Sequence, residues 1–280
     1  MRRNLAFTAW LGAALFTGCA SLSAQMHDNT QKQLSCADRA HDGDHARHCE
    51  VREQTLPAIG RLNVDGGANG GVSIKGWLRN EVLVRARIEA SGETEGAAAN
   101  LASRVMVDGN GGQVKASGPQ GGQNLGWSVS YEIFVPQATD LTMTTNNGGI
   151  AIADVRGQIR FETRNGGVDL KRVEGDISGE TSNGGISVDL AGANWSGRQM
   201  DLKTRNGGVQ LTAPSRLSAN IVAESGLGSI QSDFPMPQTN GLNNRERSRK
   251  VEFAVGAGGP PIHIATGNGG IRLKRSDGQQ

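Results

Sequence analysis

The stretch Thr163-Arg164-Asn165-Gly166-Gly167-Val168-Asp169-Leu170 is followed eighteen residues later by Thr181-Ser182-Asn183-Gly184-Gly185-Ile186-Ser187-Val188. The tripeptide Asn-Gly-Gly occurs seven times in the 280 residues, beginning at Asn69, Asn110, Asn147, Asn165, Asn183, Asn206 and Asn268. Five copies extend to Thr-x-Asn-Gly-Gly-[Val/Ile]-x-[Val/Ile/Leu], starting at Thr145, Thr163, Thr181, Thr204 and Thr266. Self-similarity at a near-constant period indicates a repeat architecture, so this pattern decides the fold.

Each repeat describes short strands separated by turns. Asn and Gly accept positive φ, which predicts turns at the pairs Asn147-Gly148, Asn165-Gly166, Asn183-Gly184, Asn206-Gly207 and Asn268-Gly269. Alternating β-branched residues follow each pair, and a second turn is expected at Gly157, Gly175 and Gly192. The pattern predicts an all-β fold, a β-solenoid or β-helix-like stack of short strands in which Asn and Thr columns hydrogen-bond from coil to coil. A meander of Asn-Gly hairpins is the alternative.

Residues 55–277 are predicted to form the β-repeat domain. Its N-terminal half is less regular: residues 81–90 and 127–135 alternate like half-buried strands, and residues 95–104, Ala-rich and preceded by Thr94, predict one short helix that covers an end or flank of the sheet. The long gaps between Asn-Gly-Gly copies are interpreted as two or three units each. This interpretation predicts ten or eleven successive coils.

The first 24 residues are predicted to be a signal peptide. An Arg pair at positions 2 and 3 precedes an apolar run over residues 5–16, which is too short to span a bilayer as a helix. Cleavage before Cys19 would leave a lipid-anchored cysteine, whereas cleavage after Ala24 would release the protein, and both remain open. The sequence therefore predicts an exported protein of the periplasm, outer membrane or cell surface, whose only membrane contact is a lipid at Cys19.

Residues 25–54 are predicted to form a linker that holds cysteines and histidines. Cys36 and Cys49 form an even pair, which in an oxidising compartment indicates a disulfide. His41, His45 and His48 lie between them at helical spacing, so a metal site is the alternative interpretation. Nearby glycine and aspartate residues disfavour a helix there, and we expect neither a metal nor a cofactor.

The order of the motifs resembles a known family. Leu62-Asn63-Val64 leads into Asn69-Gly70-Gly71-Val72, a strand ends at Val135-Pro136, and the serial repeats run to Ile271. In this the chain is similar to a bacterial family of exported, Gly-rich β-repeat proteins known as "putative adhesins" and catalogued as a domain of unknown function. The resemblance covers about residues 50–275. It implies a β-helix-type exported or surface protein, and it supplies no catalytic residues.

Composition argues against a nucleic-acid-binding protein, and the motifs argue against an enzyme. Without the Arg pair of the leader, 27 basic residues face 27 acidic ones, so the chain lacks the positive charge that nucleic-acid binding requires. Nucleophile-elbow, zinc-protease and phosphate-loop motifs do not occur. The residues expected to point outward after each Gly-Gly pair form no carboxylate column; they are Ser73, Ala151, Asp169, Ser187, Gln210 and Arg272. Asp169 and Asp189 are interpreted as solvated.

The sequence therefore predicts a non-enzymatic, exported cell-envelope protein that acts as an adhesin-like binding or structural module. Its partner would be an envelope, cell-surface or glycan ligand. Two alternatives remain: an envelope sensor or regulatory partner in which the His/Cys segment is a switch, and a carbohydrate-active β-helix enzyme.

Overall fold

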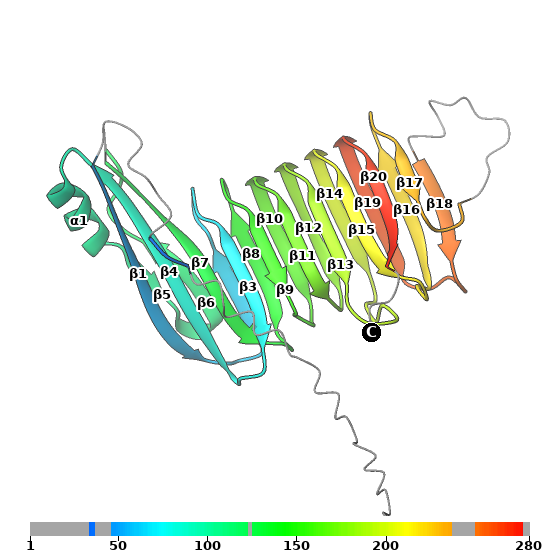
Figure 1. Ribbon diagram of the computed structural model, residues 1–280, viewed down its shortest axis with the longest axis horizontal. Helices are drawn as coiled ribbons and strands as arrows, with labels where there is room; N and C mark the ends of the chain where they lie inside the picture. The colour runs from blue at the N-terminus through cyan, green and yellow to red at the C-terminus, as the bar shows by residue number, and fades with distance from the viewer. Residues whose placement is uncertain (1–33, 37–45, 123–124, 237–249, 277–280) are drawn as a thin grey trace, which may run out of the picture. The chain divides into compact units, whose positions relative to one another are not determined.

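Two sheets of ten strands each make up most of the structure (Figure 1). The computed structural model describes residues 34–36, 46–122, 125–236 and 250–276. Most neighbouring strands run parallel, and the chain alternates between the sheets, so one strand from each sheet forms one layer. The predicted β-solenoid is confirmed. The hairpin meander is wrong, because the Asn-Gly-Gly segments connect the two sheets instead of joining antiparallel neighbours.

The first sheet, sheet A, begins with three long strands and continues with short ones. In spatial order its strands are β1 (Ala46–Pro57), β4 (Glu81–Gly92), β7 (Gly126–Pro136), β3 (Val72–Trp77), β9 (Ile150–Ala153), β11 (Val168–Val173), β13 (Ile186–Leu190), β15 (Val209–Pro214), β20 (Ile271–Ser276) and β17 (Ile230–Ser232).

The second sheet, sheet B, packs against one face of sheet A. Its strands, in spatial order from the opposite end, are β18 (Lys250–Val255), β16 (Ala219–Ser225), β19 (Pro261–Asn268), β14 (Met200–Asn206), β12 (Ile177–Asn183), β10 (Ile159–Asn165), β8 (Asp140–Thr145), β2 (Arg61–Asp65), β6 (Gln113–Ser117) and β5 (Met106–Asp108). The core lies between the sheets, where Val168 and Leu170 of β11 face Ile159 and Phe161 of β10, all at most 3 % exposed.

The described residues form eight parallel layers, fewer than the ten or eleven predicted. In order they are β6/β7, β2/β3, β8/β9, β10/β11, β12/β13, β14/β15, β19/β20 and β16/β17. The expectation that the layers follow one another in chain order is wrong at both ends of the stack. The layer β2/β3 lies between two layers that follow it in the sequence, and β19/β20 lies between two layers that precede it.

The residues in the long gaps form caps in place of the extra coils. Strands β1 and β4 extend sheet A antiparallel to β7, and β5 and β18 extend the two ends of sheet B in the same way. Helix α1 (Glu95–Ser103) begins at Thr94, whose hydroxyl accepts a hydrogen bond from the N–H of Ala97, and it packs on β4 and β1. The predicted helix is therefore confirmed. Caps of this kind cover strand edges that would otherwise pair with other chains.

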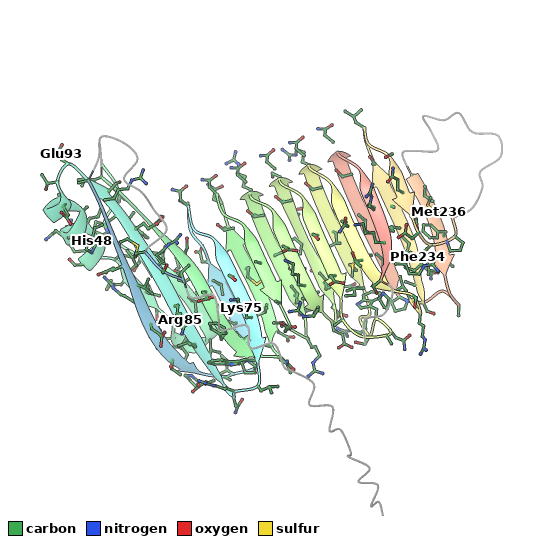
Figure 2. All side chains as sticks on the ribbon, in the orientation of Figure 1. His48, Lys75, Arg85, Glu93, Phe234 and Met236 are labelled. Carbon is green, nitrogen blue, oxygen red and sulfur yellow. A yellow bond between two sulfur atoms is a disulfide. The ribbon has the colours of Figure 1, made fainter. Side chains whose placement is uncertain are left out.

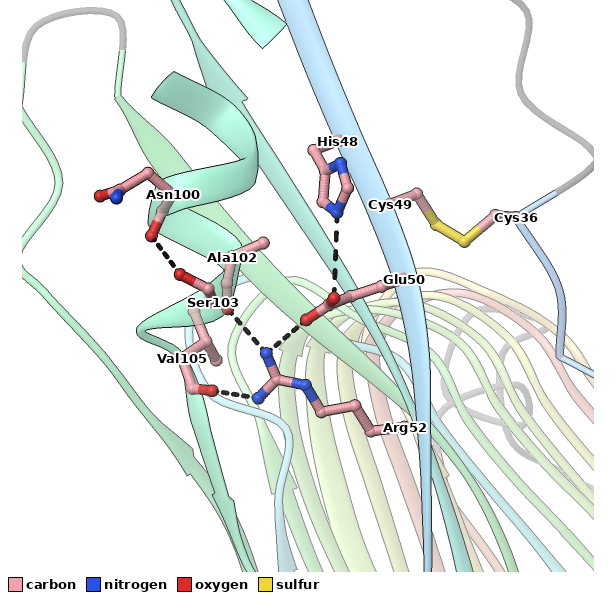
Figure 3. Close-up of polar contacts among 9 residues, drawn as sticks. All are labelled: Cys36, His48, Cys49, Glu50, Arg52, Asn100, Ala102, Ser103 and Val105. Carbon is pink, nitrogen blue, oxygen red and sulfur yellow. Dashed lines mark hydrogen bonds and ion pairs between the residues drawn. A yellow bond between two sulfur atoms is a disulfide. The ribbon is translucent and has the colours of Figure 1, made fainter. Parts of the chain in front are cut away.

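The predicted linker over residues 25–54 is wrong in its last part, which forms strand β1. Residues 46–54 lie in this strand and pair along their whole length with β4, so the folded domain begins before residue 55. Arg52 of β1 reaches the carboxyl end of α1, where its guanidinium donates to the carbonyl oxygens of Ala102 and Val105 and pairs with Glu50 (Figure 3). A cation that satisfies the last carbonyls of a helix stabilises that end.

A continuous asparagine ladder runs along one corner of the stack. The amide Nδ2 of each asparagine donates to Oδ1 of the asparagine in the adjacent layer at 2.7–2.9 Å, through Asn268, Asn206, Asn183, Asn165, Asn147 and Asn69. The predicted Asn-Gly-Gly corners are therefore in register along one edge. The exception is Asn110, which lies in the 3-10 turn η2 (Asn110–Gly112) outside the ladder.

A column of buried threonines forms hydrogen bonds at the same corner, on its inner side. The hydroxyls of Thr145, Thr163, Thr181, Thr204 and Thr266 each donate to the carbonyl oxygen of the first glycine in the adjacent layer, at 2.7–3.0 Å. All five threonines are at most 7 % exposed. The hydroxyl therefore satisfies a carbonyl that the corner geometry leaves outside the regular strand pairing.

Replacing one of these hydroxyls with a methyl group should destabilise the stack. Thr181→Val keeps the shape of the side chain but leaves the carbonyl of Gly166 without this donor, so we expect a loss of about 1–2 kcal/mol in the free energy of unfolding. Thr181→Ser, which retains the hydroxyl, is the matched control and should lose less. Urea denaturation measures both; an equal loss in the two variants would show that the hydrogen bond contributes nothing.

Candidate functional site

The two glycines of each Asn-Gly-Gly corner differ in the space around them. A Cβ on the first glycine would lie only 2.0–2.1 Å from a carbonyl oxygen of the adjacent layer, as measured at Gly148, Gly166, Gly184, Gly207 and Gly269. The first glycine is therefore required by close backbone contact between layers.

The predicted reason for these glycines, a positive φ, is wrong at four of the five corners. Gly148, Gly166, Gly184 and Gly269 have no positive φ, whereas Gly207 has a φ of 158°. The second turn does use positive φ, with 148° at Gly157, 105° at Gly175 and 76° at Gly192. The chain thus changes direction at one corner by glycine conformation and at the other by tight packing between layers.

The second glycine of each corner has no such structural requirement. An added Cβ would lie 3.2–3.7 Å from its nearest neighbour at Gly71, Gly149, Gly167, Gly185, Gly208 and Gly270, and none of them has a positive φ. All are exposed except Gly71, which is half-buried. A Cβ would fit by ordinary contact at Gly71, Gly149 and Gly167, and more tightly at Gly185, Gly208 and Gly270, yet the repeat leaves all six positions bare.

This column of second glycines forms the floor of a groove, here called the glycine groove, on the outer face of sheet A. Its volume is about 970 Å³, and it crosses the strands from β7 to β20. Besides the glycines it is lined by the outward residues expected from the sequence, namely Ser73, Ala151, Asp169, Ser187, Gln210 and Arg272. Leu34 and Arg87 lie at one end. The outward column that the sequence predicted is therefore the wall of a groove.

The groove offers hydrogen-bond donors and little negative charge. Arg87 lies at one end and Arg272 at the other, while the carboxylate of Asp169 is paired with Lys171 at 2.8 Å. Among the described residues, no hydrogen-bond partner is present for the backbone N–H groups of Gly149, Gly167, Gly185, Gly208 and Gly270. Their carbonyls, by contrast, accept bonds from the adjacent layer, as Gly167 does from Ile150 at 3.0 Å. One such donor is thus repeated in five adjacent layers, from β8/β9 to β19/β20, whereas the N–H of Gly71 in the layer β2/β3 donates to the hydroxyl of Ser130 at 3.4 Å.

Comparison with known proteins identifies the family. The model of the Toastrack DUF4097 family matches residues 68–274. The chain belongs to this family. No curated protein sequence matches it.

Solved structures similar to this Toastrack chain share little sequence with it. A "putative cell adhesion protein" of Clostridium sporogenes is 11 % identical with a TM-score of 0.42, covering 82 % of this chain and 100 % of its own. A "putative adhesin" of Bacteroides fragilis is 11 % identical with a TM-score of 0.41, covering 82 % and 97 %. A "putative lipid binding protein" of Parabacteroides distasonis is 10 % identical with a TM-score of 0.28, covering 82 % and 97 %.

A cluster of charged side chains lies on the outer face of sheet A next to the groove. Glu132 of β7, only 4 % exposed, accepts from Lys75 Nζ at 2.9 Å, from Arg85 at 3.5 Å and from the N–H of Leu34 at 3.1 Å. Lys75 and Arg85, both labelled in Figure 2, also place their cations 5.4 Å from the centre of the Phe134 ring. Residues 34–36 are thus held across β7, with Leu34 at the end of the groove.

The cysteine and histidine predictions have different outcomes. Cys36 and Cys49 are bonded as a disulfide, with their Cα atoms 5.9 Å apart, which anchors residues 34–36 to β1. His41, His45 and Cys19 lie outside the described residues. His48 lies 3.9 Å from Glu50, on the side of β1 opposite to the disulfide (Figure 3). Among the residues that the structure describes, no three His, Cys, Asp or Glu side chains are grouped to hold a metal.

Among the described residues on the outer face of sheet B, Ser178, Asp201 and His263 do not form a catalytic triad. His263 contacts Asp201 at 2.9 Å, and Ser178 lies on the adjacent strand, but on the far side of Asp201 from His263. A nucleophile must contact the histidine that activates it, which this order of strands prevents.

None of the helices among the described residues has the length and apolarity needed to cross a membrane.

An acid-sensitive contact joins Asp176, between β11 and β12, to Arg198, between β13 and β14. Asp176 accepts from the side chain of Arg198 and from its backbone N–H, and these bonds lower the pKa of Asp176 from 3.8. The native state then holds its proton less tightly than the unfolded state, so the contribution is present above pH 3.8 and is lost as the pH falls through the native pKa. Asp176→Asn and Arg198→Gln should both flatten the acid limb of a plot of Tm against pH; an unchanged limb would contradict this role.

Proposed function

We propose that this Toastrack protein is a non-enzymatic binding module and that the glycine groove is its ligand-binding surface. The observation that carries the proposal is the column of second glycines. No positive φ requires glycine at these positions, and a Cβ would make ordinary contacts at Gly71, Gly149 and Gly167 and tighter ones, of 3.2–3.3 Å, at the other three. Residues other than glycine would suit the extended backbone better. Six bare positions in one line keep a surface open to a ligand. Access of a ligand to the groove thus explains why these positions are glycine although the fold does not require it.

The proposal places the protein outside the cytoplasm. The leader over residues 1–24 would direct export, and a lipid on Cys19 would anchor the chain to a membrane if cleavage falls before it. The Cys36–Cys49 disulfide supports this placement, because such bonds persist in oxidising compartments. The partner would then be a component of the envelope or of another cell surface, recognised over several layers as extended repeat surfaces generally are.

Binding of labelled protein to isolated bacterial envelopes and to intact cells tests the proposal. Gly149→Val and Gly167→Val together place two side chains on the floor of the groove, where the Cβ distances of 3.4 and 3.7 Å allow them. We expect envelope binding to fall at least tenfold while the fold is kept. Ser178→Val, on the outer face of sheet B, is the matched control and should bind normally. Equal binding by all three proteins would refute the groove as the binding surface.

A further inference from the structure

We propose that the ligand of the glycine groove is a straight, unbranched glycan that lies along the glycine column with about one sugar to each layer. This inference rests on the proposed function and adds the chemical class of the ligand. It is drawn from three properties of the groove: the spacing of its donors, the character of its floor and its charges.

The spacing of the donors is set by the stack of layers. The glycine N–H groups without a partner recur once in each of five adjacent layers, directly before strands β9, β11, β13, β15 and β20, which lie side by side in Figure 1. Neighbouring strands are about 4.8 Å apart, so a matching ligand must present an acceptor at about that interval along a straight line. A β-1,4-linked pyranose chain in its extended form advances by slightly more than this distance per sugar. Successive rings are turned over, but each ring carries oxygen atoms on both of its edges, so every sugar can present an acceptor to the donor of its layer.

An extended peptide does not match this repeat. It advances about 3.3 Å per residue, and groups on the same side recur about every 6.7 Å, so its carbonyls would fall out of step with the donors within two layers. Peptides bind sheets well when they lie parallel to an edge strand, whereas this groove crosses the strands at the middle of sheet A.

An acyl chain matches the donors even less well. A lipid tail would displace water from the glycine N–H groups and from Arg87 and Arg272 without offering an acceptor, which makes such burial unfavourable. The groove supplies donors and cations, and its one carboxylate, Asp169, is already paired with Lys171. A ligand rich in hydroxyl, acetamido or carboxylate oxygens complements this arrangement.

Calorimetric titration of the full chain with pure oligosaccharides tests the proposal. The probes are β-1,4-linked glucose and N-acetylglucosamine oligomers from the disaccharide to the octasaccharide. Affinity should rise with chain length and level off near the hexasaccharide, since six second glycines form the floor. The α-1,4-linked glucose oligomers, which curve, are the control and should bind at least tenfold more weakly. Gly167→Val should lower the affinity for the hexasaccharide at least tenfold.

Two further measurements separate the possible failures. Ser187→Phe fills the groove from its wall without changing a glycine, so loss of glycan binding in this variant as well supports the site even if Gly167→Val folds poorly. If no oligosaccharide binds, but Gly167→Val still abolishes binding to envelopes, to extended peptides or to phospholipid vesicles, the glycan is wrong and the groove stands. If Gly167→Val changes no binding of any kind, both proposals fail.

Discussion

Gly166→Ala is expected to lose about 3 kcal/mol of unfolding free energy, although it adds a single methyl group at the surface of the stack. The new Cβ would lie 2.0 Å from the carbonyl oxygen of Gly148 and 2.6 Å from its carbonyl carbon. Both are backbone atoms fixed by the pairing of adjacent layers, so neither can move without separating the layers. A loss of this size corresponds to a fall of roughly 10 °C in Tm for a domain of this length.

The adjacent glycine provides the matched control. Gly167→Ala places its Cβ 3.7 Å from the nearest atom, the carbonyl oxygen of Gly185, and the backbone there has no positive φ. The alanine also restricts the unfolded chain, so we expect the stability of this variant to be unchanged or raised by up to about 1 kcal/mol. Chemical denaturation of the two variants in parallel measures the contrast. Similar losses in both would overturn the distinct roles assigned to the two glycines.

The sequence predicted the repeat but not the order of its layers. Recurrent Thr and Asn at fixed offsets were sufficient to predict the side-chain ladders and their register, because equivalent residues in a constant repeat must stack. The insertion of β2/β3 and β19/β20 between other layers was not predictable. It depends on pairing between strands far apart in the chain, which the local repeat signal does not contain.

The sequence predicted the residues of the candidate site but not that they form a groove. The outward column at Ser73, Asp169 and Ser187 was recognised, but it was read as a surface without a carboxylate row, not as the wall of a groove. The different roles of the two glycines depend on distances between layers, which no local pattern contains. Glu132 was missed for a similar reason: it alternates like a surface residue, and it is buried because residues 34–36 cross β7.

Glu132→Gln should cost about 3 kcal/mol, an effect as large as that of Gly166→Ala, because it leaves two cations beside a neutral amide. The carboxylate is 4 % exposed and holds Lys75, Arg85 and the N–H of Leu34 together at the end of the groove. Glu53→Gln is the matched control: Glu53 pairs with the same Arg85 at 2.7 Å, but its side chain is 54 % exposed, so its loss should cost at most about 1 kcal/mol. Urea denaturation measures both variants. Equal losses would show that burial does not strengthen this cluster, whereas the expected difference would establish Glu132 as the residue that fixes residues 34–36, and with them Leu34, against sheet A.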